Sequence, residues 1–374
     1  MLNKPKIRVL VVDDSLVFDR FLLENLPKAQ PRIEVVGYAM NAYDAMRKIP
    51  GLKPDVITLD VEMPKMSGIE FLKELLPKHP IPVILVSSLN VGVFDALAYG
   101  AVDFVRKPDM SVENSTSRFV QNLSAKILIA SQAKVKLPAS VRNSAPQTNT
   151  AVPPSKPGSP AARRHPASCS SVIKLTSTAS LRLNSTVIAI GASTGGTEAT
   201  LEVLRQLPGD IPGIVITQHM PKGFTQMYAE RLNRLCQMQV KEAEDGDVIR
   251  RGRALIAPGG DLQMKVVRSG RDYIVRCIPG EKVNGHRPSV DVLFQSVAQT
   301  VKGNSIGIIL TGMGQDGAQG LLQMKKAGAY TIGQDKESCV VYGMPMVAQK
   351  IGAVNKQASC SAIPGVLMGH LNSF

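Results

Sequence analysis

The chain has 374 residues and is 44% hydrophobic, too long for one ordinary core and too apolar for wholesale disorder, so we expect two domains with connections. Its net charge is +14, but ten Lys/Arg and one Glu lie between Met110 and Asn184, which is typical of a solvated tether rather than a nucleic-acid-binding surface. Apolar runs are short, as where residues 9–12 end at Asp13, and we expect no membrane insertion because a spanning helix needs about 20 apolar residues.

The N-terminal part of the chain alternates short β-branched runs with amphipathic stretches. The predicted strands are residues 7–12, 34–39, 56–60, 81–87 and 102–105. The predicted helices are residues 15–26, 42–49, 68–78, 91–98 and 112–134. This alternation predicts a flavodoxin-like, doubly wound parallel sheet of five strands.

Acidic side chains stand where two of these strands end. Asp13 and Asp14 follow the first strand, and Asp60 ends the third. In the common small doubly wound order these strands are neighbours, so the three carboxylates meet at one edge of the sheet. Like charges this close call for a cation, and Mg²⁺ suits hard oxygen ligands with room for water. Either of the first two aspartates alone is more simply a cap for the helix that begins near Ser15.

Two further polar groups belong to the same edge: Ser87 ends the fourth strand, and Lys107 follows the fifth, directly before Pro108. The segments 11–15, 59–68, 86–88 and 107–108 resemble a response-regulator receiver domain, and the resemblance covers about residues 5–130. It implies that Asp60 is the phospho-acceptor. It also implies that Asp13 and Asp14 hold Mg²⁺ with it, that Ser87 is the switch hydroxyl and that Lys107 is the phosphate partner.

Residues 135–184 are rich in Pro, Ser, Ala and Lys/Arg. Such a composition cannot bury enough apolar surface to offset the entropy of ordering it. We therefore expect a receiver domain over residues 1–134, a flexible basic linker over 135–184 and a second domain over 185–374.

Strand-like runs resume at residues 186–190, 213–217, 254–257 and 305–310. Residues 263–267 and 273–277, separated by a short turn, predict an antiparallel hairpin. The second domain is therefore predicted to be α/β, with a mostly parallel sheet and an antiparallel hairpin.

Residues 191–196, Gly-Ala-Ser-Thr-Gly-Gly, follow the first strand of this domain and open a helix. They fit the G-x-S-x-G pattern, in which small neighbours let a serine occupy a tight strand-to-helix turn. Free N–H groups at the helix N-terminus would then stabilise an oxyanion. A phosphate-binding loop has the same features, and the loop alone does not separate the two interpretations.

Two other predicted strand ends favour the hydrolase. His219 follows the strand 213–217, and Asp316 follows the strand 305–310, so both lie at the edge that carries Ser193. A nucleotide loop has no need of the histidine, whereas a serine hydrolase needs it as general base with an aspartate to orient it. Singly, His219 would be an ordinary loop or core histidine and Asp316 a helix cap. The order serine, histidine, aspartate along the chain argues against the α/β-hydrolase fold but not against the chemistry.

His286 is a rival histidine on a loop before the predicted helix 289–300. We interpret it, with Arg287, as a substrate-contact or loop-anchoring residue.

The segments 191–196, 218–221, 286–291, 310–317 and 334–345 resemble the chemotaxis protein-glutamate methylesterases, over about residues 185–360. The resemblance implies hydrolysis of glutamyl methyl esters on the cytoplasmic helices of chemoreceptors, and deamidation of certain receptor glutamines, without a cofactor for the hydrolysis. It implies Ser193 as nucleophile, His219 as base and Asp316 as orienting acid, with the backbone N–H of Met313 as an oxyanion donor.

The expected partners are methylated chemoreceptors and a chemotaxis histidine kinase as phosphodonor. Five scattered cysteines without a CxxC pair indicate reduced thiols and a cytoplasmic protein. We expect the unphosphorylated receiver to cover the Ser193 crevice. Three other outputs of the second domain are a nucleotide-binding module, a binding or scaffold protein with relic catalytic groups, and, least favoured because no helix-turn-helix pattern is present, a DNA-binding domain.

Overall fold

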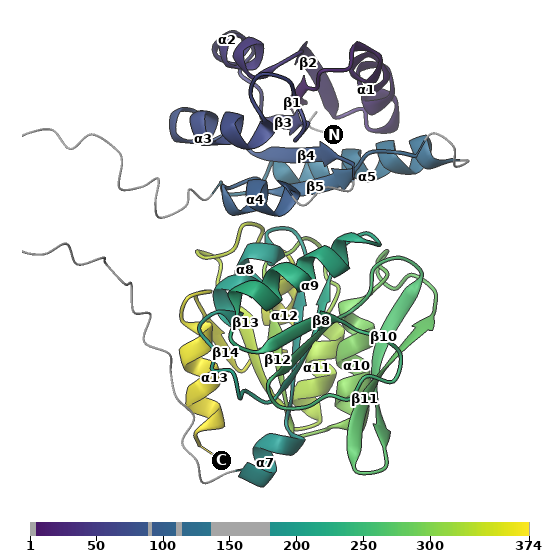
Figure 1. The fold of residues 1–374 in the computed structure, drawn as a ribbon, viewed down its shortest axis with the longest axis vertical. Coiled ribbons are helices and arrows are strands. Elements are labelled where there is room, and N and C mark those ends of the chain that lie inside the picture. Colours follow the sequence, from purple (N-terminus) through teal and green to yellow (C-terminus); the bar gives the residue numbers. More distant parts are fainter. Residues whose placement is uncertain (1–4, 89–91, 110–113, 136–179, 374) are drawn as a thin grey trace, which may run out of the picture.

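The computed structural model describes residues 5–88, 92–109, 114–135 and 180–373. Two α/β domains pack against each other, the receiver in purple to blue and the second domain in teal to yellow (Figure 1). The predicted linker lies almost entirely in residues 136–179, outside the described residues, so the division at 134 and 184 stays a prediction.

The receiver has the predicted five-stranded parallel sheet, with strand order β2-β1-β3-β4-β5. Its strands are β1 (Ile7–Val12), β2 (Ile33–Ala39), β3 (Val56–Leu59), β4 (Val83–Ser87) and β5 (Asp103–Arg106). Its helices are α1 (Leu16–Ala29), α2 (Ala42–Leu52), α3 (Gly68–Lys78), α4 (Gly92–Ala98) and α5 (Ser115–Ala130). Strands β1 and β3 are neighbours, in register from Val9 with Val56 to Val12 with Leu59, as the acidic motif requires.

The second domain is built on a seven-stranded sheet with the order β14-β13-β12-β6-β7-β9-β8, whose paired strands are all parallel. Its strands are β6 (Val187–Ala192), β7 (Gly213–Gln218), β8 (Gln239–Glu242), β9 (Arg253–Ile256), β12 (Ser305–Ile309), β13 (Tyr330–Gln334) and β14 (Lys356–Ala358). The predicted hairpin is present as β10 (Leu262–Ser269) and β11 (Asp272–Pro279), and forms a separate two-stranded sheet. The fold class of both domains is confirmed.

Helices cover both faces of the large sheet. They are α7 (Ser180–Ser185), α8 (Gly196–Leu204), α9 (Phe224–Leu235), α10 (Val290–Thr300), α11 (Ala318–Lys326), α12 (Met344–Lys350) and α13 (Ile363–Leu371). The sequence analysis did not predict β8, β13 or β14. The outer strands β8 and β14 are short and partly polar, reading Gln-Val-Lys-Glu and Lys-Gln-Ala, and they lack the apolar run on which strand prediction depends.

The α4–β5 side of the receiver faces helices α8 and α9 (Figure 1). Aromatic side chains of α4 and β5 contact aromatic side chains of α9. The ring centroids of Phe104 and Phe224 lie 4.5 Å apart, and those of Phe94 and Tyr228 lie 5.8 Å apart. All four rings are buried, and such pairs each contribute about 0.5–1.5 kcal/mol beyond the burial of their area. The receiver is therefore packed on the second domain in part through buried aromatic side chains.

Candidate active site

Ser193 occupies the sharp turn between β6 and α8. Its backbone N–H donates to Thr311 O at 3.0 Å, and its carbonyl accepts from the Gly196 N–H at 2.7 Å and from Gln218 Nε2 at 2.9 Å. These bonds fix the turn from both neighbouring strand ends. The serine is half-buried, so its hydroxyl is accessible while its backbone is held.

His219 lies beside this turn because of strand register. Ala192 and Gln218 are paired across β6 and β7, so the next residues, Ser193 and His219, leave neighbouring strands side by side. The imidazole is only 8% exposed, and its Nε2 lies 2.8 Å from Asp316 Oδ2. Within the part of the chain that the structure describes, its Nδ1 is buried and has no hydrogen-bond partner.

The carboxylate of Asp316 has five hydrogen-bond donors around it. Besides His219, its donors are Asn284 Nδ2 (2.9 Å), Ser289 Oγ (2.7 Å), Val290 N (2.7 Å) and Asp291 N (3.2 Å). The two backbone donors belong to the first turn of α10, whose N-terminus carries partial positive charge. Burial acts to raise the pKa of Asp316, but the hydrogen bonds outweigh it and hold the pKa well below its ordinary value. The carboxylate is therefore ionised and accepts the Nε2 proton of His219.

The turn at residues 283–286 brings two side chains to this pair. Val283 and His286 exchange both backbone hydrogen bonds, and Asn284 and Gly285 between them have φ of 52° and 83°. An Asn-Gly pair adopts this left-handed geometry readily. Asn284 bonds Asp316, while the ring of His286 stacks on that of His219, with centroids 3.7 Å apart and an 8° angle between the planes.

Met313, the predicted oxyanion donor, lies next to a glycine that touches the serine. A Cβ placed on Gly312 would come 2.7 Å from the Cβ of Ser193, so only glycine permits this approach. Among the hydrogen bonds of the described residues, the Met313 N–H has none, and its side chain is 39% exposed. A backbone donor without a partner, next to the glycine that touches the serine, is compatible with the predicted oxyanion role.

The guanidinium of Arg287 is bonded to three residues of this chain. Its Nε donates to Gly260 O at 3.0 Å, its Nη1 donates to Gly280 O at 2.8 Å, and its Nη2 pairs with Asp261. These bonds tie the loop before α10 to the start and end of the β10–β11 hairpin. Substrate contact by Arg287 stays a prediction.

The receiver carries the second cluster of reactive groups. Ligand atoms of Asp13, Asp14 and Asp60 all lie within 4.8 Å of one another, which is close enough for one cation. Burial raises the pKa of Asp13, against the opposing effect of Lys107. Carboxylate oxygens with one exposed member and room for water are the ligands that Mg²⁺ prefers, so the residues present fit this ion.

Lys107 and Ser87 complete the pocket. The Lys107 ammonium lies 2.8 Å from Asp13 Oδ2 and 2.6 Å from Asp60 Oδ2. Burial acts to lower the pKa of Lys107, but these two ion pairs raise it above its ordinary value. Ser87 is buried, and within the described residues its hydroxyl has no partner. The structure thus brings all five predicted receiver residues to one edge.

A direct hydrogen bond joins the two domains next to the turn that carries Ser193. Thr194 Oγ1 donates to Asp103 Oδ2 at 2.6 Å, and the other oxygen of Asp103 pairs with Lys126 Nζ at 2.5 Å. Thr194 follows Ser193 directly, so the receiver strand β5 touches the loop that carries the serine. The sequence contained no signal for this contact, because its partners lie 91 residues apart.

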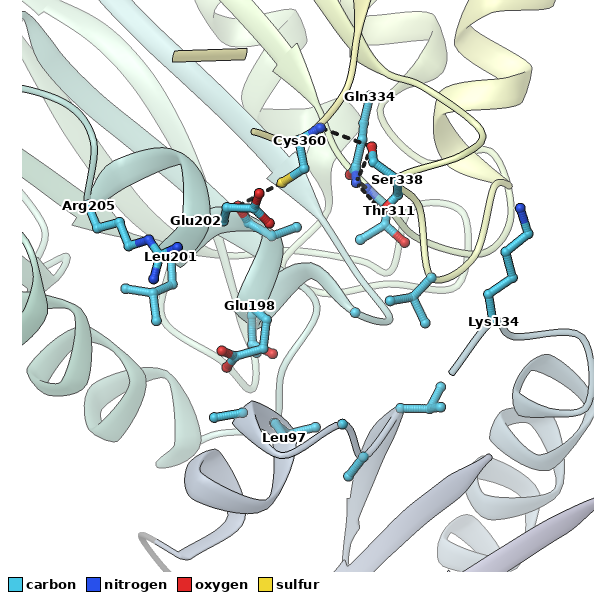
Figure 2. Close-up of a pocket in the computed structure, with 18 residues that line it drawn as sticks. Leu97, Lys134, Glu198, Leu201, Glu202, Arg205, Thr311, Gln334, Ser338 and Cys360 are labelled. Atoms are coloured by element: carbon cyan, nitrogen blue, oxygen red, sulfur yellow. Dashed lines mark hydrogen bonds between the residues drawn. The ribbon is translucent and has the colours of Figure 1, made fainter. Parts of the chain in front are cut away.

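A cavity of about 470 Å³ lies beside this contact (Figure 2). Leu97 and Lys134 of the receiver line one side, and the helix α8 residues Glu198, Glu202 and Arg205 line the other. The triad side chains do not belong to its lining, although Thr311 and Gly195 come from the same loops. The cavity is a packing gap between the domains, separate from the candidate catalytic groups.

Sequence reasoning missed the residues that hold Asp316 in place. Asn284 and Ser289 were not singled out, yet both donate to its carboxylate. Ser289 also accepts from Val292 N as the N-cap of α10, and the Pro288-Ser289 pair before an apolar stretch was a usable signal for this helix start. Nothing in the local sequence indicated that the helix N-terminus would face an aspartate from another loop.

Two family models match the chain. The one described as CheB methylesterase matches residues 188–367, and the one described as response regulator receiver domain matches residues 9–113. None of the described helices combines the length and the apolar character that crossing a membrane requires.

Similar proteins extend over nearly the whole chain. A protein-glutamate methylesterase/protein-glutamine glutaminase 2 of Syntrophomonas wolfei is 48% identical over 367 residues, 98% of this chain and 98% of that protein. A protein-glutamate methylesterase/protein-glutamine glutaminase of Sulfurimonas denitrificans is 47% identical over 353 residues, 93% of this chain and 94% of that protein. The crystal structure of the Thermotoga maritima CheB methylesterase catalytic domain covers 50% of this chain and 98% of its own, with 36% identity and a TM-score of 0.48.

Proposed function

Because the chain belongs to the family of receiver-linked CheB methylesterases, we propose that it hydrolyses methyl esters of glutamyl side chains on chemoreceptors and deamidates specific receptor glutamines. The observation that carries the site assignment is the buried His219–Asp316 pair beside the serine turn. This pair favours an esterase over a nucleotide-binding loop, because a phosphate cradle has no use for an oriented imidazole.

In the proposed reaction Ser193 attacks the ester carbonyl while His219 Nδ1, the ring nitrogen without a partner, accepts the hydroxyl proton. Asp316 accepts a hydrogen bond from the Nε2–H of His219 and stabilises the imidazolium that forms. The Met313 N–H and the N–H groups of the turn that leads into α8 would support the oxyanion. His219 then returns its proton to the departing methanol, or to ammonia from a glutamine, and water hydrolyses the acyl-enzyme to free glutamate.

The receiver would regulate this site through phosphorylation of Asp60 by a chemotaxis histidine kinase. Asp13, Asp14 and Asp60 would hold Mg²⁺, which would neutralise charge on the phosphoryl group. Lys107 would bind a phosphoryl oxygen, and the unpartnered hydroxyl of Ser87 would turn toward it. The contact between Asp103 and Thr194 supports a closed resting state, in which the receiver limits access to the serine. Such an enzyme would work in the cytoplasm, where the receptor helices and the kinase are found.

The test is methanol release from membranes with methylated chemoreceptors, with and without a small-molecule phosphodonor. We expect Ser193→Ala to lower turnover by about 10³-fold or more while receptor binding persists. Asp60→Asn should keep the basal rate and lose the response to phosphodonor. Turnover retained in Ser193→Ala would refute the nucleophile. A phosphodonor response retained in Asp60→Asn would refute the phosphorylation site.

A further inference from the structure

We propose that His286 is a positioning residue for the base, whose neutral ring face stabilises the imidazolium form of His219. The inference rests on the proposed role of His219 and adds a residue to it. It assigns His286 to the chemistry of the triad instead of to substrate contact.

The arrangement of the two rings is the first argument. The two ring centroids lie 3.7 Å apart and the planes are 8° from parallel, so one face of the His286 ring lies against the ring of His219. Two neutral aromatic rings prefer an offset or an edge-to-face arrangement, because their faces carry like partial charge. A cation over a ring face is attracted instead. The stack therefore gains attraction once one of the two rings is protonated.

The charge of His286 is the second argument. The charged groups that act on it are His219, Asp316, Lys282 and Lys126, the last from helix α5 of the receiver. Burial, followed by His219, lowers the pKa of His286 to about 4, and Asp316 opposes this shift. The ring is therefore neutral near pH 7, so it presents a π face and not a second positive charge.

The backbone that holds His286 is the third argument. The pair of hydrogen bonds between Val283 and His286 closes the Asn284-Gly285 turn, and the same turn directs Asn284 onto Asp316 at 2.9 Å. One rigid turn thus supports both partners of the catalytic pair, the acid through Asn284 and the base through His286. A residue that served only to contact substrate would not need to stack on the base.

The attraction between the two rings affects catalysis because it strengthens only when His219 becomes protonated. The role proposed for His219 requires a neutral ring that accepts the hydroxyl proton and a positive ring in the tetrahedral intermediate. A stack that is more favourable in the second state lowers the barrier without tightening substrate binding. Its loss should therefore reduce kcat and leave KM nearly unchanged.

The experiment compares His286→Phe, which keeps a ring that cannot titrate, with His286→Leu, which has similar bulk and no π face. Full-length protein with phosphodonor is assayed for methanol release from methylated receptor membranes across pH. We expect Phe to stay within about 3-fold of wild type and Leu to lose about 10-fold in kcat with KM unchanged. The acid limb of the kcat/KM profile should move to lower pH in Leu and stay in place in Phe, because only Leu destabilises the imidazolium.

Three results would overturn the inference. Wild-type kcat and pH profile in His286→Leu would show that the stack contributes nothing. Equal losses in Phe and Leu would show that the polar atoms of the imidazole matter, as in substrate contact. His219→Gln is measured in parallel, and activity retained in it would overturn both the role of His219 as base and this inference. If His219→Gln loses activity while His286→Leu behaves as wild type, only the role of His286 is overturned.

Discussion

Asp60 in the receiver and Asp316 in the catalytic domain both follow an inner strand of a parallel sheet, but their surroundings differ. Asp60 shares a lysine with Asp13 and lies within ligand distance of two other carboxylates, one of them exposed. Asp316 is buried with five donors directed at it, two of them from a helix N-terminus, and it shares the donor Asn284 with the buried Asp291. The first setting leaves oxygen atoms available to a cation or a phosphoryl group. The second fully occupies the carboxylate, which can then only orient and stabilise a neighbour.

The comparison teaches that the edge of the sheet determines where a site forms, while the local donors determine what its carboxylate does. Three variants test this view, and we take them from the largest expected effect to the smallest.

The first variant breaks the oriented pair. Asp316→Asn should lower kcat by about 10³- to 10⁴-fold, because the amide no longer stabilises the imidazolium or favours the correct tautomer. Ser289→Ala, which removes one of the donors to the carboxylate, should cost only about 10-fold or less. Both are measured as methanol release under phosphodonor. Similar losses in the two variants would mean that the donor shell, and not the carboxylate charge, dominates.

The second variant removes one polar contact between the domains without changing either cluster. Asp103→Ala removes the acceptor of the Thr194 hydroxyl, so the basal rate without phosphodonor should rise about 5-fold or more. The phosphodonor-activated rate should change little. Asp95→Ala, an exposed position on α4, is the matched control and should leave both rates unchanged. An unchanged basal rate in Asp103→Ala would exclude this contact as a restraint on the active site.

The third variant concerns a carboxylate that belongs to neither site. Asp19 on α1 is buried, and no hydrogen-bond partner for either of its oxygens is found in the described ranges. Burial, followed by the charge of Asp13, raises its pKa to about 7. The folded chain thus keeps a proton that the unfolded chain releases, and stability falls as the pH rises from about 4 to about 7.

Asp19→Asn abolishes this dependence, so the variant should exceed wild type by roughly 2 kcal/mol at pH 8 and by clearly less at pH 5. Urea unfolding in the presence of a chelator measures the difference. Glu24→Gln, on the exposed side of the same helix, should show no such trend. If the difference in unfolding free energy between Asp19→Asn and wild type does not vary with pH, Asp19 is not the group that keeps the proton.

The sequence by itself determined the strand ends and the chemistry they carry. Residue types at these positions are informative because the carboxyl ends of parallel strands lie at one edge of their sheet. The sequence alone therefore placed Asp13 beside Asp60 in the receiver, and Ser193 beside His219 in the second domain. The resemblance of the two halves to receivers and methylesterases pointed to the same residues, and the fold class and the family agree with it.

Only the tertiary structure decided how each group is held. The donors to Asp316, the stack of His286 on His219 and the bond from Thr194 to Asp103 join segments far apart in the chain. No local pattern encodes such contacts, because they depend on how helix α10, the turn at 283–286 and the receiver pack. Residue type specified which reactions are possible, whereas packing specified which nitrogen of His219 is free, which carboxylate stays ionised and which receiver residue bonds the loop that carries the serine.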